Sequence, residues 1–160
     1  MSKKIPLTQG KFAIVDDEDY ERVNQYKWCA FKSAYGVYYA MRFENKKNIP
    51  MHRFILGLGD KKILVDHIDC DGLNNTKSNL RESTHAQNGR NRGKQANNTS
   101  GYKGVFWNKG AKKWIPAIRV DKKMIALGCF DCKIEAAKAY NEAAIKYHGE
   151  FARLNEIPQI

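Results

Sequence analysis

The chain has 160 residues, of which 42% are hydrophobic and 11% aromatic, so it can bury the core of one ordinary domain or two small ones and is not globally disordered. The formal net charge of +11 suggests a polyanionic partner, and no apolar run approaches the roughly 20 residues that span a bilayer. The basic start of the chain has no apolar run behind it and the four cysteines suggest no disulfide framework, so we expect no signal peptide and an intracellular, cytoplasmic protein.

The first part of the chain combines hydrophobic alternation with short helical patterns, which predicts mixed β-strand and helix. In chain order we expect a strand at 11–15, a short helix capped by Asp16 or Asp17, a hairpin of strands 27–32 and 37–43 with its turn at 33–36, a second turn at 44–48, and one or two helical turns within 51–58.

A strand, a polar loop, a second strand and a helix are predicted next. The strands are 63–68 and 80–83, and the loop at 69–79 contains Gly72 and the pair Asn74–Asn75. Thr84 can cap a helix that runs to about Asn91, with Gln87 at the third position of a capping box. The following Gly-, Asn-, Lys- and Ser-rich segment is typical of a linker.

The last part of the chain predicts three strands and a helix, at 102–107, 113–120, 123–130 and 132–147, with Asp131 as N-cap and Gly149 after the helix. Alternation in the middle strand places Trp114, Pro116, Ile118 and Val120 on the core face and Lys113, Ile115, Ala117 and Arg119 on the other. Pro116 lacks the N–H that a middle strand should donate, so we expect a possible bulge there.

Asp66 and His67 end an apolar strand, and Asn88 lies on the following helix. A neutral histidine can take a proton from water, and carboxylate and amide oxygens are hard ligands that suit Mg²⁺ or Mn²⁺. Since adjacent strand residues point to opposite faces, Asp66 and His67 can present the metal and the base from different directions. The sequence therefore predicts catalytic His67, with Asp66 and Asn88 as metal ligands.

These residues carry a resemblance to a known family. Residues 65–75 (VDHIDCDGLNN), then Ser78–Arg81 and the pairs Gln87–Asn88 and Asn91–Arg92, resemble the HNH motif of phage and intron-encoded homing endonucleases. The resemblance covers about the first 92 residues and implies a ββα-metal nuclease fold at 63–92. It also implies that Asn79 braces the loop that orients His67, so Asn79 joins His67 as a predicted catalytic residue.

A second resemblance covers residues 100 to 155. Ser100–Val105, Leu127–Asp131 and Glu135–Tyr140 are similar to the ethylene-response-factor (Apetala-two) DNA-binding domain of plants, which is also found fused to HNH nucleases. The resemblance implies that the three-stranded sheet enters a DNA major groove while the helix packs behind it. Phe106, Ala117, Met124 and Ala126 depart from the residues common in that family, so its target sequence does not carry over.

Basic residues are concentrated where DNA contacts are expected. Between Arg90 and Lys123 there are ten Lys or Arg and one acid, Asp121. A solvated basic face without function is the alternative. The predicted DNA-binding residues are Arg53, Arg81, Arg90, Arg92, Lys103, Lys109, Lys113, Arg119, Lys122 and Lys123.

Together these patterns predict an α+β protein with an HNH endonuclease domain at 1–92, a linker at 93–100 and an Apetala-two-type DNA-binding domain at 101–160. We expect a metal-dependent endonuclease that binds double-stranded DNA as a monomer and nicks one strand, in the host cytoplasm if it is phage-encoded. The alternative is a non-catalytic DNA-binding regulator with a relic HNH domain.

Three other metal or ligand readings are weaker. The acids after His67 do not make a calcium loop, because Gly72 comes too early and Leu80 stands where the terminal glutamate belongs. The lone pair Cys129 and Cys132 has no partner pair for zinc. His85 shares a helix face with Asn88 and is interpreted as a surface residue, with metal or phosphate contact as alternatives.

Overall fold

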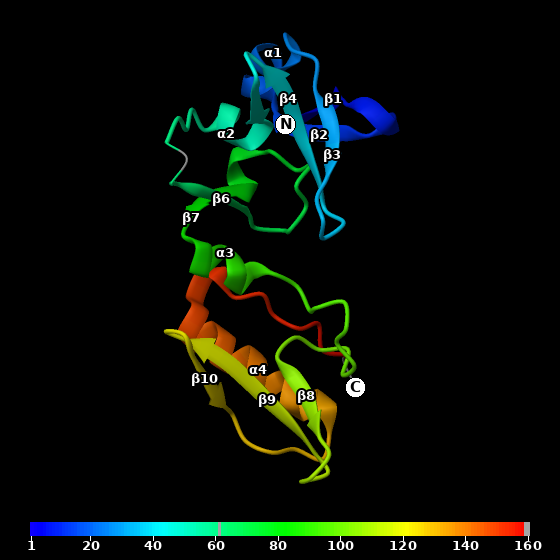
Figure 1. Ribbon diagram of the computed structural model, residues 1–160, viewed down its shortest axis with the longest axis vertical. Coiled ribbons are helices and arrows are strands. Elements are labelled where there is room, and N and C mark those ends of the chain that lie inside the picture. Colours follow the sequence, from blue (N-terminus) through cyan, green and yellow to red (C-terminus); the bar gives the residue numbers. More distant parts are fainter. Residues whose placement is uncertain (61, 159–160) are drawn as a thin grey trace. The chain divides into compact units, whose positions relative to one another are not determined.

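The computed structural model describes residues 1–60 and 62–158, and the chain divides into two compact units, Met1–Asn88 and Gly89–Ile160 (Figure 1). Both units contain helices and antiparallel strands, so the predicted combination of helix and sheet is confirmed. None of the helices in the described residues is long and apolar enough to cross a membrane.

The first unit is built from short antiparallel sheets. Its elements are β1 (Ser2–Pro6), η1 (Thr8–Gly10), β2 (Phe12–Asp16), α1 (Asp17–Asn24), β3 (Cys29–Lys32), β4 (Tyr38–Glu44), β5 (Lys47–Pro50), α2 (Met51–Ile55), β6 (Leu64–His67), η2 (Lys77–Asn79), β7 (Leu80–Ser83) and the start of α3 (His85–Asn91), whose last three residues belong to the second unit. β1 pairs with β2, β4 lies between β3 and β5, and β6 pairs with β7. The last of these hairpins leads directly into α3 (Figure 1).

One hydrophobic core joins these sheets. Alternate residues of β2 are buried in it, and Val23 of α1, Trp28 and Met51 of α2 are buried with them. The Trp28 indole N–H donates to the Val23 carbonyl at 2.9 Å, which satisfies its buried polar group. Residues far apart in the sequence therefore meet in the core that supports the β6–β7 hairpin.

Two strands of this unit differ from the sequence prediction. β1 was not predicted, because Ile5 is its one buried residue and a single apolar position has no period. The predicted turn at 44–48 is shorter, since Asn45 and Lys46 take positive φ values of 49° and 60° and allow β5 to begin at Lys47. Such φ values at a two-residue turn suit an antiparallel hairpin even without glycine.

The helix after β7 begins as predicted. The Thr84 backbone N–H donates to Gln87 Oε1 at 2.8 Å, and the Gln87 N–H donates to Thr84 Oγ1 at 3.2 Å. This reciprocal capping box fixes the start of α3 immediately after β7. It therefore holds Asn88 one helical turn into α3, where its backbone N–H donates to the Thr84 carbonyl at 2.9 Å.

The second unit contains β8 (Val105–Asn108), β9 (Lys113–Val120), β10 (Lys123–Ala126), α4 (Lys133–His148) and η3 (Gly149–Phe151). β9 is the middle strand of the antiparallel sheet, and α4 packs against one sheet face. Pro116 and Ile118 are buried on that face while Arg119 is exposed, so the predicted core face of the middle strand is confirmed. Gly104 allows the backbone before β8 to lie close to Tyr140 of α4, since a Cβ at Gly104 would lie 2.1 Å from the Tyr140 ring.

Pro116 needs no bulge. It pairs with Val105 in continuous register, and its carbonyl accepts a hydrogen bond from the Leu127 N–H at 2.9 Å. In a strand the N–H and carbonyl of one residue point to the same side, so the missing donor faces the place where β10 has just ended at Ala126. The proline therefore leaves out only the last bond at the end of the ladder between β9 and β10 and none within it.

Two smaller points concern α4 and the segment before β8. The N-cap is Cys132 and not Asp131, whose carboxylate instead forms an ion pair with Lys113 at 2.5 Å. Residues 93–100, predicted as a linker, lie within the second unit. Ser100 is buried there, and the Asn98 side chain donates to the Tyr102 carbonyl at 2.8 Å.

Candidate active site

Asp66 and His67 lie side by side at the end of β6, and both side chains are buried. Asp66 pairs in register with Arg81 of β7, whose Nε and Nη2 donate to Asp66 Oδ2 at 2.9 Å and 2.7 Å. Two bonds from one guanidinium fix the orientation of the carboxylate and balance its charge. Arg81 was predicted to contact DNA, and the structure places it against Asp66.

The His67 ring is enclosed by side chains from three other parts of the first unit. The ring of His52, from α2, meets it edge to face with centroids 5.1 Å apart, and the ring of Tyr39, from β4, lies at 5.8 Å. Asn75 Oδ1 lies 3.5 Å from His67 Nε2. Burial lowers the pKa of His67, although nearby carboxylates oppose the shift. His67 is therefore neutral near pH 7 and able to accept a proton.

The loop after β6 is held by the side chain of Asn79. Its Nδ2 donates to Asp69 Oδ1 at 2.9 Å and to the Asn74 carbonyl at 2.8 Å, while its Oδ1 accepts from the Asp69 N–H at 3.0 Å. Burial alone would raise the pKa of Asp69, but hydrogen bonds from the Asp71 backbone, Asn74 and Asn79 outweigh it and lower the pKa. Asp69 is thus a charged acceptor that organises the loop.

The N-terminal strands hold the same loop from its other side. The Ile14 N–H donates to the Leu73 carbonyl at 2.8 Å, and the Asn75 N–H donates to the Ile14 carbonyl at 2.7 Å. Gly72 passes so close to β4 that a Cβ there would lie 2.4 Å from the Tyr38 carbonyl oxygen and 2.6 Å from the Tyr39 ring. The loop beside His67 therefore depends on residues about sixty positions earlier in the chain.

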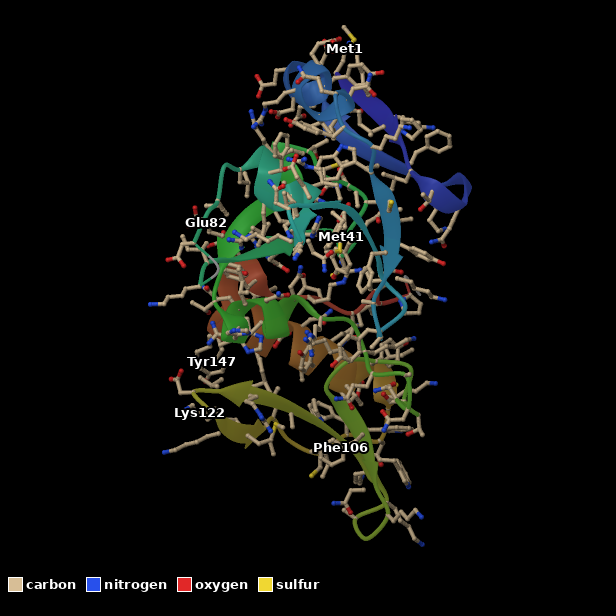
Figure 2. The ribbon with its side chains drawn as sticks, turned by 45° about the horizontal axis from the view of Figure 1, so that its top comes forward. Met1, Met41, Glu82, Phe106, Lys122 and Tyr147 are labelled. Carbon is tan, nitrogen blue, oxygen red and sulfur yellow. The ribbon has the colours of Figure 1, made fainter. Side chains whose placement is uncertain are left out.

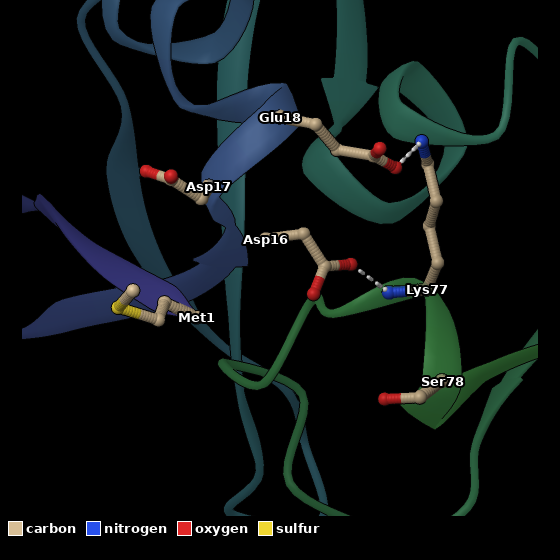
Figure 3. A pocket seen from close by; sticks show the side chains of 6 residues that line it. All are labelled: Met1, Asp16, Asp17, Glu18, Lys77 and Ser78. Carbon is tan, nitrogen blue, oxygen red and sulfur yellow. Dashed lines mark hydrogen bonds and ion pairs between the residues drawn. The ribbon is translucent and has the colours of Figure 1, made fainter.

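A shallow acidic hollow completes this attachment (Figure 3). Lys77 spans it, with its backbone N–H donating to Asp16 Oδ2 at 2.7 Å and its ammonium donating to Glu18 Oε1 at 2.6 Å. Asp16 was predicted as a possible cap of α1, and it occupies the N-cap position without a side-chain bond to the helix. Its carboxylate instead holds the start of η2, whose last residue is Asn79.

Asn88, the other predicted metal ligand, is half-buried on α3, and His85 on the same helix is exposed. Among the described residues, no group of three His, Cys, Asp or Glu side chains is arranged to hold a metal ion. The predicted ligands Asp66 and Asn88 are a different set, one carboxylate and one amide, of the hard oxygen type that Mg²⁺ and Mn²⁺ accept.

The remaining basic residues divide into internal and exposed ones. The Arg53 guanidinium donates to the backbone carbonyls of Leu58, Asp60 and Ile63, and so clamps the segment between α2 and β6. In the second unit the Lys103 ammonium donates to the Arg90 carbonyl, and Lys113 pairs with Asp131. The exposed members of the predicted set are Arg92, Lys109, Arg119, Lys122 and Lys123.

The outer face of the β8–β10 sheet combines these charges with exposed apolar side chains. Phe106 of β8 and Met124 of β10 are 49% and 62% exposed. Both pair with residues of β9, Phe106 with Ile115 and Met124 with Arg119. Figure 2 labels Phe106 on β8 and Lys122 at the turn between β9 and β10. This face lies opposite the face that packs on α4.

Comparison with known proteins identifies the family. A family model described as HNH endonuclease matches residues 56–90. The chain is also 33% identical, over 161 residues, to an uncharacterized HNH endonuclease of Acanthamoeba polyphaga mimivirus, and the match covers 93% of this chain and 77% of that relative. This protein belongs to the HNH endonuclease family. Protein 3.8 of Escherichia phage T7 is 32% identical to this chain over 93 residues, and the match covers 58% of this chain and 76% of the phage protein. No solved structure matches the chain.

Sequence reasoning missed three side chains around His67. Tyr39 and His52 lie far from His67 in the sequence and follow no metal or catalytic spacing, so only the fold brings them to His67. Asn75 was predicted as part of the polar loop at 69–79. Its position beside a second asparagine in the loop after Asp66–His67 was the one signal that could have singled it out.

Proposed function

We propose that this HNH protein is a metal-dependent endonuclease that hydrolyses a phosphodiester bond of double-stranded DNA. The observation that carries the proposal is a buried, neutral imidazole next in the chain to a buried, oriented carboxylate, within the segment that matches the HNH model. His67 takes a proton from the attacking water. Asn79 keeps the loop beside His67 in place through its three hydrogen bonds.

Asp66 and Asn88 are the residues that would hold the divalent metal ion. The Asp66 carboxylate is held in one orientation by Arg81, and an amide oxygen is a second hard donor, so the set fits Mg²⁺ or Mn²⁺, which keep several waters and phosphate oxygens in their coordination shell. When bound, such an ion polarises the phosphate and neutralises the leaving oxygen. Arg81 has a double effect here, because it orients Asp66 and also reduces the negative charge that attracts a cation.

The second unit is proposed to supply DNA affinity and the choice of cleavage site. Exposed Arg119, Lys122 and Lys123 lie on or beside the outer sheet face, where cationic side chains can contact phosphates. Phe106 and Met124 on that face would contact base edges in the major groove. Both relatives come from viruses, which supports action inside an infected host cell. A homing role at one preferred site rests on the resemblance of the Asp66–His67 segment to homing endonucleases.

One experiment separates the nuclease from a non-catalytic regulator. Purified protein is incubated with supercoiled plasmid and Mg²⁺, with and without a chelator, beside His67→Ala and the control His85→Ala, which changes an exposed histidine of α3. We expect chelator-sensitive cleavage that His85→Ala retains and His67→Ala loses by about 10²–10⁴-fold in rate, with DNA affinity unchanged within about threefold. DNA binding without metal-dependent cleavage would instead identify a regulator.

The order of products tests whether the protein acts as a monomer. One Asp66–His67 pair hydrolyses one phosphodiester at a time, and two different units in one chain suit an asymmetric footprint better than a symmetric dimer. Open circles should therefore accumulate before linear plasmid. Linear DNA that forms without a nicked intermediate, together with two chains per bound site, would contradict the monomeric nicking model.

A further inference from the structure

A neutral histidine has two tautomers, and the tautomer decides which ring nitrogen can accept a proton. The nitrogen that carries no hydrogen is the basic one, and its identity is usually set by the hydrogen bond that the other nitrogen makes. The proposed role of His67 requires a basic nitrogen, but it does not by itself say which one that is. The contacts that the His67 ring makes in the first unit indicate which nitrogen is basic.

The side chain of Asn75 is oriented by the chain around it. Asn75 is 1% exposed, its backbone N–H donates to the Ile14 carbonyl at 2.7 Å, and its Nδ2 donates to the Leu73 carbonyl at 3.0 Å. A carbonyl oxygen can only accept, so the amide group that faces Leu73 has to be the NH₂. The opposite orientation would place two oxygens against each other. The Oδ1 of Asn75 is therefore directed to its other neighbour, His67 Nε2, at 3.5 Å.

The His67 ring is also limited in its own rotation. His52 packs perpendicular to it, with an angle of 88° between the ring planes, and Tyr39 packs at 62°. Tyr39 is in turn held against the loop at Gly72, where no side chain intervenes. Rotation of the His67 ring out of its plane would disturb contacts from α2 and β4 together. A half-turn would keep the plane but place Cε1 opposite Asn75 Oδ1 and lose the contact with Nε2, so Nε2 stays on the side of Asn75.

We propose that Asn75 is a positioning residue that selects the tautomer of His67, with the proton on Nε2 directed to Asn75 Oδ1 and the basic lone pair on Nδ1. In the other tautomer the Nε2 lone pair would face the lone pairs of Oδ1, which is repulsive. The bond is long in the protein alone, and catalytic hydrogen bonds often shorten only when substrate is bound. The Leu73 carbonyl thus orients the Asn75 side chain, and Asn75 Oδ1 decides which ring nitrogen of His67 carries the proton.

The catalytic meaning of this tautomer rests on the proposed function, but the tautomer itself is a property of the protein without DNA or metal. The full-length chain is labelled with ¹⁵N-histidine, and long-range ¹H–¹⁵N correlations are recorded at about pH 8, where His67 is neutral. His67→Gln assigns the His67 signals among the four histidines. We expect Nε2 to be the protonated nitrogen, and an Nδ1–H tautomer in the wild type would overturn the proposal.

Substitution of Asn75 tests the assignment directly. Asn75→Ala removes the acceptor and should leave His67 as a mixture of tautomers. The matched control Asn24→Ala changes an exposed asparagine at the end of α1 and should alter neither signal. A His67 tautomer that is the same in Asn75→Ala as in the wild type would overturn the assignment to Asn75.

Single-turnover cleavage of a DNA duplex tests the consequence for catalysis. In Asn75→Ala the rate of the cleavage step should fall at least about tenfold while DNA affinity stays within about threefold, because the change acts on the proton acceptor and not on a DNA contact. A tautomer mixture with a wild-type cleavage rate would overturn the positioning role. A wild-type protein with the Nε2–H tautomer that cuts no DNA would support the tautomer assignment and refute the proposed nuclease function.

Discussion

Replacement of Asn79 by alanine is the perturbation that best tests what holds the loop after β6, residues 69–79, in place. The side chain is buried and makes three hydrogen bonds, one of them to the carboxylate of Asp69. A bond to a charged partner contributes about 1.5–3 kcal/mol and a neutral one about 0.5–1.5 kcal/mol. Water entering the vacated space can replace part of the lost hydrogen bonding. We therefore expect Asn79→Ala to lower the free energy of unfolding of the first unit by about 2–4 kcal/mol.

The assay has to report on the first unit alone. Hydrogen exchange of the buried β2 residues Ala13 and Val15 measures its opening free energy, and single-turnover plasmid nicking measures the cleavage step. Ser78→Ala, at the exposed neighbouring position, is the matched control and should change neither quantity. Nicking by Asn79→Ala should fall about 100-fold or more, because the bonds that set the path of the loop beside His67 are lost. A loss of stability under about 1 kcal/mol with wild-type nicking would refute this account of the loop.

Three further perturbations address other parts of the protein. Burial, with smaller contributions from the charges of His67 and Arg53, lowers the pKa of His52 to about 3, so the folded protein keeps His52 neutral while the unfolded chain takes up a proton below its ordinary value of 6.5. His52 should therefore lower the free energy of unfolding by about 1.4 kcal/mol per pH unit as the pH falls from about 6.5 to about 3, and His52→Phe should remove that part of the slope in urea denaturation series. Gly72→Ala should cost about 1–3 kcal/mol in the same measurement and slow nicking, because its Cβ would collide with the Tyr38 carbonyl; unchanged stability would mean that the loop can move aside. Removal of Lys122 and Lys123 should reduce the slope of log affinity against log salt by up to about 1.8, while Lys138→Ala on α4 should leave it unchanged; equal slopes would exclude the β9–β10 turn from the DNA contact.

Local pattern was enough to predict several elements around the proposed active site. Thr84 and Gln87 identified the start of α3, since a capping box depends only on residues three positions apart. The alternation in β9 identified its buried face, because a strand that packs on a helix repeats every second residue. The order of Asp66, His67, Asn79 and Asn88 resembles the HNH motif, and that resemblance suggested a nuclease before any fold was known.

Tertiary structure decided what each of these residues contacts. Arg53 and Arg81 were predicted from the sequence to contact DNA. In the structure Arg53 donates to backbone carbonyls and Arg81 orients Asp66, because the guanidinium group has several donors that can satisfy acceptors inside the protein. Tyr39, His52 and Asn75 reach His67 only through the packing of β4, α2 and the loop. Spacing along the chain carries no signal for contacts of this kind, since they arise when separate elements close on one core.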